Sequence, residues 1–286
     1  MVLTVLLVVA VAAFGSARWF NTALISIQPS EFAKIVIILV LAEFFSKNQA
    51  RIGNLVWVGR SFLTMLFIVI PVLLQPNLST SIVIMVIWFA LLWASGLKLQ
   101  HLALFIALAV ITPVVSFPFL VDYQKDRIMN FISPDPGATT GATYNVNQAL
   151  ISIGSGGWFG KGYGHGTQVQ LRFLKVRWSD FIFSAMAEEL GFVGVVLVML
   201  LLLFVIYRCL RTARMARDTF GALICYGVAT LLAFQAMVNI GVNLNVMPAT
   251  GLPLPFVSYG GSSLLSLLIC IGLVESVALR QKSLEF

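Results

Sequence analysis

One acidic residue at the edge of a long apolar stretch is the strongest candidate for chemistry in this chain. Asp180 lies within residues 178–183, directly before the apolar run that follows. A carboxylate held at such a boundary can act as a general base. An aspartate in this place can also cap a helix that begins at Phe181, because its side chain accepts hydrogen bonds from the first free amides. The residue types alone leave both roles open and favour the cap.

Charged side chains inside apolar segments are costly to bury, so each is a candidate for function. Glu31 and Lys34 lie three residues apart at the start of one such segment. On a helix they share a face and can form an ion pair. The alternative is an ordinary helix start, with Ser30 as the cap and the acid in the first turn. The two interpretations are compatible, and the sequence does not choose between them.

Four further acids lie in or beside apolar segments, and the sequence assigns none of them to the chemistry: Glu43, Glu188, Glu189 and Glu275. Glu43 can extend to the membrane surface from a helix end. Glu188 and Glu189 stand near the start of a later segment, where a helix tolerates acids. Adjacent helical residues point about 100° apart, so at most one of this pair faces a given cavity. We expect a structural role for one of them.

A glycine-rich segment with a lysine could hold an anion. Residues 154–157 read Gly-Ser-Gly-Gly and residues 160–162 read Gly-Lys-Gly. Glycines let backbone amides approach an anion closely, and Lys161 adds positive charge. The spacing is not that of the nucleotide phosphate-binding loop, because Gly162 stands where that motif requires Ser or Thr. Basic side chains along the same loop could extend such a site or simply cover a surface: Arg127, Arg172, Lys175 and Arg177.

A second cluster, residues 251–263, contains two prolines and a glycine pair at the start of the last apolar segment. Such residues give irregular backbone, which at membrane depth is tolerated only inside protein or along a water-filled cavity. We therefore expect polar residues of this cluster and of the preceding segment to line a cavity: Ser258, Tyr259 and Ser262, with Asn239, Asn243 and Asn245.

The composition places these residues in a membrane protein. Of the 286 residues, 59% are hydrophobic and only 10% are charged, whereas a soluble domain has about 25% charged residues. A soluble fold this apolar would expose large apolar patches. The net charge of +7 comes from short basic clusters between apolar segments, a pattern typical of cytoplasmic membrane loops rather than of nucleic-acid binding. The three cysteines are too few for a disulfide framework or a metal site.

Eight apolar segments approach the roughly 20 residues that a membrane-spanning helix needs: 1–15, 31–46, 61–75, 79–96, 100–120, 184–207, 219–243 and 259–279. We predict an all-α polytopic membrane bundle, a single domain over residues 1–286. A signal peptide is the alternative for the first segment. Basic residues put the following regions on the cytoplasmic side: 47–60, 97–101, 208–218 and the C-terminal tail. The long loop, about 121–183, is then extracytoplasmic, and its aromatic and glycine content predicts a partly ordered cap with short helices.

Six motifs in order along the chain resemble the SEDS family of membrane proteins, whose members include RodA, FtsW and SpoVE. These motifs lie in residues 28–34, 75–80, 123–127, 154–168, 180–191 and 253–262. The resemblance implies a peptidoglycan glycosyltransferase at the outer face of the bacterial cytoplasmic membrane. Its implied substrate is lipid II, an undecaprenyl-pyrophosphate-linked disaccharide pentapeptide, which it would polymerise into glycan strands. A class B penicillin-binding protein is the implied partner.

The resemblance also implies roles for particular residues. Asp180 matches the family's essential acid in the large loop, which favours the catalytic base over the helix cap; it would take the proton from the acceptor sugar hydroxyl. Lys34, Arg127 and Lys161 are candidates to stabilise the pyrophosphate leaving group, and a divalent cation, Mg or Mn, is a further candidate. The expected substrate-binding set is completed by Glu31, Gln168, Ser258 and Ser262.

The chain departs from the family pattern in three places. Asn77 and Ser79 stand where the family usually has Asp and Gly, and residues 175–178 are more basic than usual. The first apolar segment aligns with the family's third, so the family's first two transmembrane helices are expected to be missing. A fragment, an incorrectly started gene and a natural short member would each explain this.

Two other functions are compatible with these residues. A flippase for lipid II would also need charged groups inside the membrane. A non-catalytic scaffold would bind the penicillin-binding protein without polymerising glycan, and Asn77 slightly favours it. Substitution of Asp180 separates the hypotheses, because only the enzyme would lose polymer.

Overall fold

The computed structural model describes residues 20–21, 26–49, 54–75, 77–98, 101, 105, 107, 111, 115, 117–134 and 141–281. Most of these residues are helical, which confirms the predicted helical membrane fold. Within these ranges the only sheet is one antiparallel pair of two-residue strands, β1 (Phe20–Asn21) and β2 (Ser26–Ile27). The chain divides into two compact units, which are described separately.

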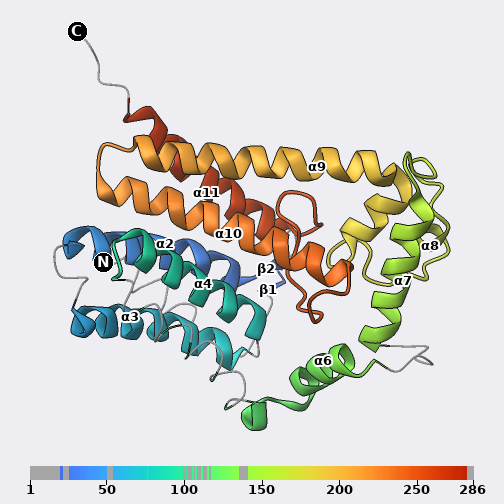
Figure 1. The fold of residues 1–286 in the computed structure, drawn as a ribbon, viewed down its shortest axis with the longest axis horizontal. Coiled ribbons are helices and arrows are strands. Elements are labelled where there is room, and N and C mark those ends of the chain that lie inside the picture. Colours follow the sequence, from blue (N-terminus) through green and yellow to red (C-terminus); the bar gives the residue numbers. More distant parts are fainter. Residues whose placement is uncertain are drawn as a thin grey trace. The chain divides into compact units, whose positions relative to one another are not determined.

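The first unit comprises residues 1–98, 203–234 and 260–286. Its described residues include the helices α2 (Pro29–Lys47), α3 (Leu55–Leu74), α4 (Leu78–Ala94) and α11 (Gly261–Leu279). Helix α2 packs against α3, α4 and α11, and α3 packs against α4 (Figure 1). A helix that is apolar on all sides is usually buried, and α2 fits this rule because Ile37, Ile38 and Leu41 are fully buried.

Local sequence explains where α3 and α2 begin. The Oδ1 atom of Asn54 accepts a hydrogen bond from the amide of Val56 at the start of α3. Helix α2 begins with Pro29 at its first position, which suits proline because that amide needs no partner. Ser30 therefore lies inside α2, and the prediction that it caps this helix is wrong.

The second unit comprises residues 99–202 and 235–259. It contains the short 3-10 helix η2 (Phe117–Phe119), α6 (Asp122–Ile132), α7 (Gly141–Gly156) and α8 (Thr167–Gln170). Helix α7 packs against both α6 and α8 (Figure 1). The short helices expected in the loop 121–183 are therefore present. Two long helices, α9 (Ile182–Met215) and α10 (Thr219–Asn243), run from one unit into the other.

Four helices of the described chain are long and apolar enough to cross a membrane: α3, α9, α10 and α11. Helix α4 is also apolar but has 17 residues, and α2 carries charged side chains at both ends. The predicted segment 1–15 lies outside the described residues, and 100–120 lies largely outside them. Helix α9 continues to Met215, so the basic residues expected in a loop 208–218 are mostly helical. The prediction of a loop there is wrong, because α9 is longer than the apolar run.

Helix α9 is interrupted near its start. Gly191 has φ 70° and ψ −173°, which no helix accommodates. In a continuous helix the amides of Phe192 and Val193 would donate to the carbonyls of Glu188 and Glu189, four residues earlier. The break frees two amides and two carbonyls. In a membrane segment these groups need other partners, because an unsatisfied backbone group is costly there.

The glycine-rich loop between α7 and α8 supplies those partners. The two amides after the break donate to the carbonyls of Gly157 and Trp158, at 2.9 and 3.1 Å. The two carbonyls before the break accept from the amides of Lys161 and Gly162, at 2.9 and 3.0 Å. Gly160, with φ +76°, lies so close that a Cβ atom there would overlap the backbone of α9. The glycines therefore allow this loop to dock into α9, and the amides of residues 161 and 162 bond α9 carbonyls.

Candidate active site

The segment that carries Asp180 is held through its main chain by the loop that follows α10. The carbonyl of Trp178 accepts a hydrogen bond from the amide of Tyr259, at 2.8 Å. The next carbonyl, of Ser179, accepts from the hydroxyl of Ser258, at 2.6 Å. The Ser258 hydroxyl oxygen in turn accepts from the amide of Leu254, at 2.8 Å. Ser258, predicted to contact substrate, therefore ties two segments of the second unit together.

The third carbonyl in this row, that of Asp180, is bonded by two side chains of α10. The Nδ2 atoms of Asn239 and Asn243 donate to it, at 3.0 and 2.9 Å. Asn239 also donates to the carbonyl of Leu252, at 2.8 Å, which brings the 251–259 loop to the same place. Three consecutive carbonyls, from residue 178 to residue 180, are thus fixed by the same part of the second unit. The asparagines, expected to line a cavity, instead hold the backbone of the predicted base.

The side chain of Asp180 is half-buried beside Gly251. A Cβ atom at Gly251 would lie 3.5 Å from Oδ2 of Asp180, and this glycine has φ +74°, a conformation that other residues rarely adopt. Helix α9 begins at Ile182, and in its first turn the amide of Ser184 donates to Oδ1 of Asn243, at 3.1 Å. A side chain from α10 thus caps an amide in the first turn of α9.

Arg127 lies in the same unit and contacts the same loop. Its Nη1 atom donates to the carbonyl of Thr250, at 3.1 Å. Arg127 also lines a shallow groove, open to solvent, between α6, α7 and residues 245–249. The groove offers amide groups and apolar side chains, among them Asn130, Asn147, Asn245, Phe131 and Met247. Ala249 lines it and Gly251 contacts Asp180, so one short loop separates the groove from the carboxylate.

Glu31 and Lys34 form the predicted ion pair in the first unit. Lys34 Nζ lies 2.7 Å from Glu31 Oε2, with side chains only 1% and 5% exposed. The hydroxyl of Ser266 in α11 donates to the same oxygen, at 3.3 Å. Ser262, also in α11, accepts a hydrogen bond from the amide of Gln28, at 3.1 Å. The predicted residues Glu31, Lys34 and Ser262 are therefore brought together where α2 meets α11.

Asn77, which departs from the family pattern, is bonded inside this unit. Its Oδ1 atom accepts from the amide of Thr80 and caps α4, at 3.2 Å. Its Nδ2 atom donates to the hydroxyl oxygen of Ser30, at 3.1 Å. An aspartate could also accept the capping bond, but it has no N–H to donate to Ser30. The asparagine therefore serves as a helix cap and as a link between α2 and α4.

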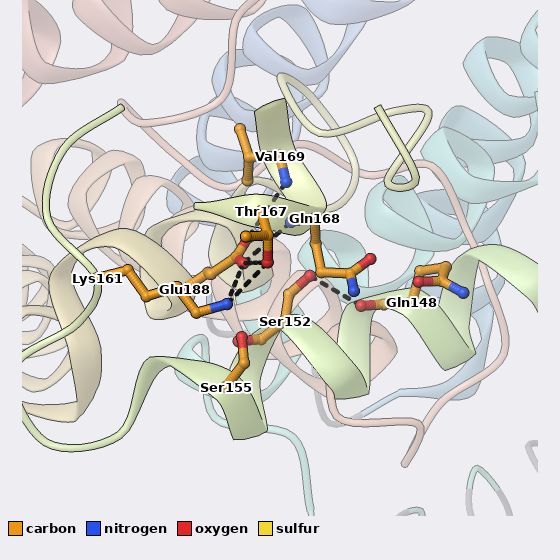
Figure 2. Close-up of polar contacts among 8 residues, drawn as sticks. All are labelled: Gln148, Ser152, Ser155, Lys161, Thr167, Gln168, Val169 and Glu188. Atoms are coloured by element: carbon orange, nitrogen blue, oxygen red, sulfur yellow. Dashed lines mark hydrogen bonds and ion pairs between the residues drawn. The ribbon is translucent and has the colours of Figure 1, made fainter. Parts of the chain in front are cut away.

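A third cluster surrounds Glu188, a residue that the sequence did not assign to any site. Its side chain is fully buried, and it accepts hydrogen bonds from Lys161 Nζ at 2.8 Å and Thr167 Oγ1 at 3.1 Å. It also accepts from the amides of Gln168 and Val169, at 3.0 and 3.2 Å. Figure 2 shows these groups converging on one carboxylate. The cluster joins α8 and the glycine-rich loop to the first part of α9.

Two predicted substrate ligands belong to this third cluster. Lys161 is 30% exposed, and its ammonium group is shared between Glu188 and Thr167. Gln168 contributes its backbone amide to Glu188, and its Oε1 atom is buried without a hydrogen-bond partner among the described residues. The structural role predicted for one of the adjacent acids Glu188 and Glu189 belongs to Glu188. Nothing local indicates which of two adjacent acids is buried.

Two residues of the predicted basic wall lie over aromatic rings. Lys175 lies over the ring of Tyr144, at 5.7 Å, and Arg177 lies over the ring of Trp178, at 4.9 Å. Arg172 is exposed. In the part of the chain that the structure describes, no three His, Cys, Asp or Glu side chains are grouped so as to hold a metal ion.

Comparison with known proteins now defines the class of this helical membrane protein. The family model of the cell cycle proteins FtsW, RodA and SpoVE matches residues 1–283, and the chain belongs to this family. It is 37% identical to the peptidoglycan glycosyltransferase MrdB of Escherichia coli K12, over 99% of this chain and 78% of that protein. It is 34% identical to the stage V sporulation protein E of Bacillus subtilis 168, over 92% of this chain and 72% of that protein.

Solved structures agree with this assignment. The fold matches a chain of a peptidoglycan synthase complex with a TM-score of 0.80 and 30% identity, covering 98% of this chain and 82% of that one. It also matches the rod shape determining protein RodA of Thermus thermophilus, with a TM-score of 0.67 and 30% identity, over 98% of this chain and 76% of that one. The predicted membership of the family and the predicted membrane fold are therefore confirmed.

Proposed function

We propose that this protein is a peptidoglycan glycosyltransferase that polymerises lipid II. The observation that carries the proposal is the fixed position of Asp180, whose segment has three consecutive carbonyls bonded by α10 and the 251–259 loop. The sequence relationship to MrdB, 37% identity over 99% of the chain, gives that carboxylate a reaction. A rigid main chain with a half-buried carboxylate suits a general base, because proton transfer requires a defined distance and direction.

In the proposed reaction Asp180 accepts the proton of the acceptor sugar hydroxyl. The deprotonating oxygen attacks the anomeric carbon of the donor sugar, and a new glycosidic C–O bond forms. The bond between that carbon and the pyrophosphate oxygen breaks, and the pyrophosphate leaves with the electron pair. Pyrophosphate is a stable anion, so the reaction does not need the second, acidic carboxyl group of ordinary glycosidases.

The leaving pyrophosphate gains negative charge, which a cation stabilises. Among the three candidates, Arg127 is the one that lines an open groove next to the loop at Asp180. Lys34 is buried in the first unit, and Lys161 belongs to the cluster around Glu188. We therefore assign the main charge contact to Arg127, and the sugar hydroxyls to the amides of the groove. A divalent cation held by phosphate and by Asp180 would add to the same stabilisation.

The proposal extends to the location and the partner. The four apolar helices and the family membership make the chain a membrane protein. The basic residues that the sequence assigns to the cytoplasmic side support a position of Asp180 on the outer face of the bacterial cytoplasmic membrane. The match to a chain of a peptidoglycan synthase complex supports assembly with a class B penicillin-binding protein.

The decisive test is polymerisation of purified lipid II by the full chain with its penicillin-binding protein. Asp180→Asn is expected to lower the rate by about 10²- to 10⁴-fold, the range for loss of a general base. Asp126→Asn is the matched control, because Asp126 is an exposed acid on α6 in the same unit. Equal rates for wild type and Asp180→Asn would exclude Asp180 as the base. A wild type that makes no glycan would remove the polymerase assignment.

Lipid II transport is a second candidate function, favoured by the buried ion pair of Glu31 and Lys34. Such pairs inside membrane segments often mark transport paths. A flippase would move labelled lipid II between the leaflets of a vesicle without producing glycan. Glu31→Gln with Lys34→Met, which removes both charges together, would abolish that movement if the pair served transport.

A further inference from the structure

The end of α10 carries a row of buried amide side chains. Gln235, Asn239 and Asn243 are spaced four residues apart and therefore lie on one face of the helix. Their exposures are 0%, 1% and 0%. A buried amide in an apolar helix is costly unless its donors and acceptors are bonded. The hydrogen bonds of each amide therefore indicate which of these three side chains hold the segment that carries Asp180.

Asn243 uses its whole hydrogen-bonding capacity. An asparagine amide has two N–H donors and one oxygen that accepts two bonds. The oxygen accepts from the amide and the hydroxyl of Ser184, at 3.1 and 2.6 Å. The nitrogen donates to the carbonyls of Asp180 and Asn239, at 2.9 and 2.8 Å. One side chain thus joins Asp180, two residues before α9, to the first turn of α9 and to α10.

Asn239 bonds the other side of the same carbonyl. Its nitrogen donates to the carbonyls of Asp180 and Leu252, at 3.0 and 2.8 Å. The carbonyl of Asp180 therefore accepts two amide hydrogens from two turns of one helix. Two donors from different directions fix the plane of the peptide group that follows Asp180, and with it the direction in which its side chain leaves the backbone.

We propose that Asn239 and Asn243 are positioning residues that orient the Asp180 carboxylate for proton transfer. The inference rests on the proposed function, because it assigns these residues a part in the same reaction. It differs from a cavity-lining role, since neither amide needs to touch the substrate. It also differs from plain structural support, because the bonds converge on the residue that performs the chemistry.

Aspartate substitutions test the proposal with the smallest change of shape. Asn243→Asp keeps an oxygen for Ser184 but removes both N–H donors, and it places a second carboxylate beside the carbonyl of Asp180. Asn239→Asp removes the donors to Asp180 and Leu252. We expect each variant to lower kcat for lipid II polymerisation by about 10²-fold, the effect of a misplacement near 1 Å. KM should change less than about twofold, because the substrate contacts remain.

Gln235→Leu is the matched control. It replaces a fully buried amide in the same row of the same helix, one turn from Asn239. Neither amide atom of Gln235 has a hydrogen-bond partner among the described residues. Loss of this amide should leave kcat and KM unchanged. A fall in kcat that Gln235→Leu shared with the asparagine variants would overturn the proposal, because it would show general sensitivity of α10.

Amide hydrogen exchange separates positioning from folding. In purified full chain, both asparagine variants should speed exchange in residues 178–184, while Gln235→Leu should not. Faster exchange together with a selective fall in kcat supports the proposal. Faster exchange with unchanged kcat overturns the positioning role. Unchanged exchange would show that the two asparagines do not hold the backbone of residues 178–184 in place. A wild type that bound lipid II but formed no glycan would refute the proposed function, and this proposal with it, whatever the exchange showed.

Discussion

Two carboxylates eight residues apart, Asp180 and Glu188, are held in opposite ways. Asp180 is anchored by its main-chain carbonyl, and its carboxylate is half-buried beside a glycine. Glu188 is fully buried, and its carboxylate itself accepts four hydrogen bonds. The main-chain bonds at Asp180 fix the direction of its side chain, whereas the four bonds to the Glu188 carboxylate make that side chain part of a structural network. The way an acid is anchored thus indicates its role better than its burial does.

The largest expected effect is on catalysis at Asp180. Asp180→Asn should lower the polymerisation rate by about 10²-fold or more, yet leave the thermal unfolding temperature within about 2 °C of wild type, because the anchoring bonds come from the main chain. The polymerisation rate and the thermal unfolding temperature, measured on the same preparation, test these two expectations. A large loss of stability in Asp180→Asn would mean that its carboxylate has a structural role like that of Glu188.

The opposite result is expected at Glu188. Glu188→Gln should lower the free energy of unfolding by about 3 kcal/mol, because removing one charge of a buried pair leaves its partners uncompensated. Glu189→Gln is the matched control one residue away, and it should change stability by less than about 0.5 kcal/mol, as is usual outside such networks. Denaturant unfolding in detergent measures both. Equal stability of the two variants would contradict the assigned role of Glu188.

The helices were predictable from the sequence because each depends on a local pattern. The apolar segment 219–243 coincides with α10, and the segment 31–46 lies within α2. The ion pair of Glu31 and Lys34 was also predictable, since a spacing of three residues places both on one helix face. Helical periodicity and hydropathy are sufficient for such features.

The break in α9 could not be predicted, because it depends on residues far away in the sequence. A single glycine inside an apolar helix is usually tolerated without a break. Gly191 breaks α9 only because the loop 157–162 supplies the missing backbone bonds. The asparagine clamp on Asp180 has the same origin, since its bonds cross 59 and 63 residues. Sequence reasoning therefore named the candidate base and also Asn239, Asn243 and Ser258, but it expected the latter to line a cavity and did not predict their bonds to the main chain around Asp180.

A glycine beside Glu188 allows the structural role of this carboxylate to be tested by adding a methyl group next to it. A Cβ atom at Gly166 would lie 2.8 Å from Oε2 of Glu188, which that bonded side chain cannot relieve. Gly166→Ala should therefore lower the free energy of unfolding by about 2 kcal/mol, as overpacking does. Gly154→Ala is the control, because its helical position is open. An unchanged melt for Gly166→Ala would show that the Glu188 network can shift freely.

The smallest effect is expected at Lys161. Its substitution tests whether Lys161 serves the Glu188 network or the catalytic site at Asp180. The Lys161 side chain is 30% exposed, and three other hydrogen bonds to the Glu188 carboxylate remain without it. Lys161→Met should therefore lower the free energy of unfolding by only about 1 kcal/mol. The KM for lipid II should stay within about twofold of wild type. Lys175→Met, an exposed lysine of the same loop, is the control for loss of charge. A KM raised about tenfold in Lys161→Met alone would instead place Lys161 on the pyrophosphate and extend the catalytic site from Asp180 to the Glu188 network.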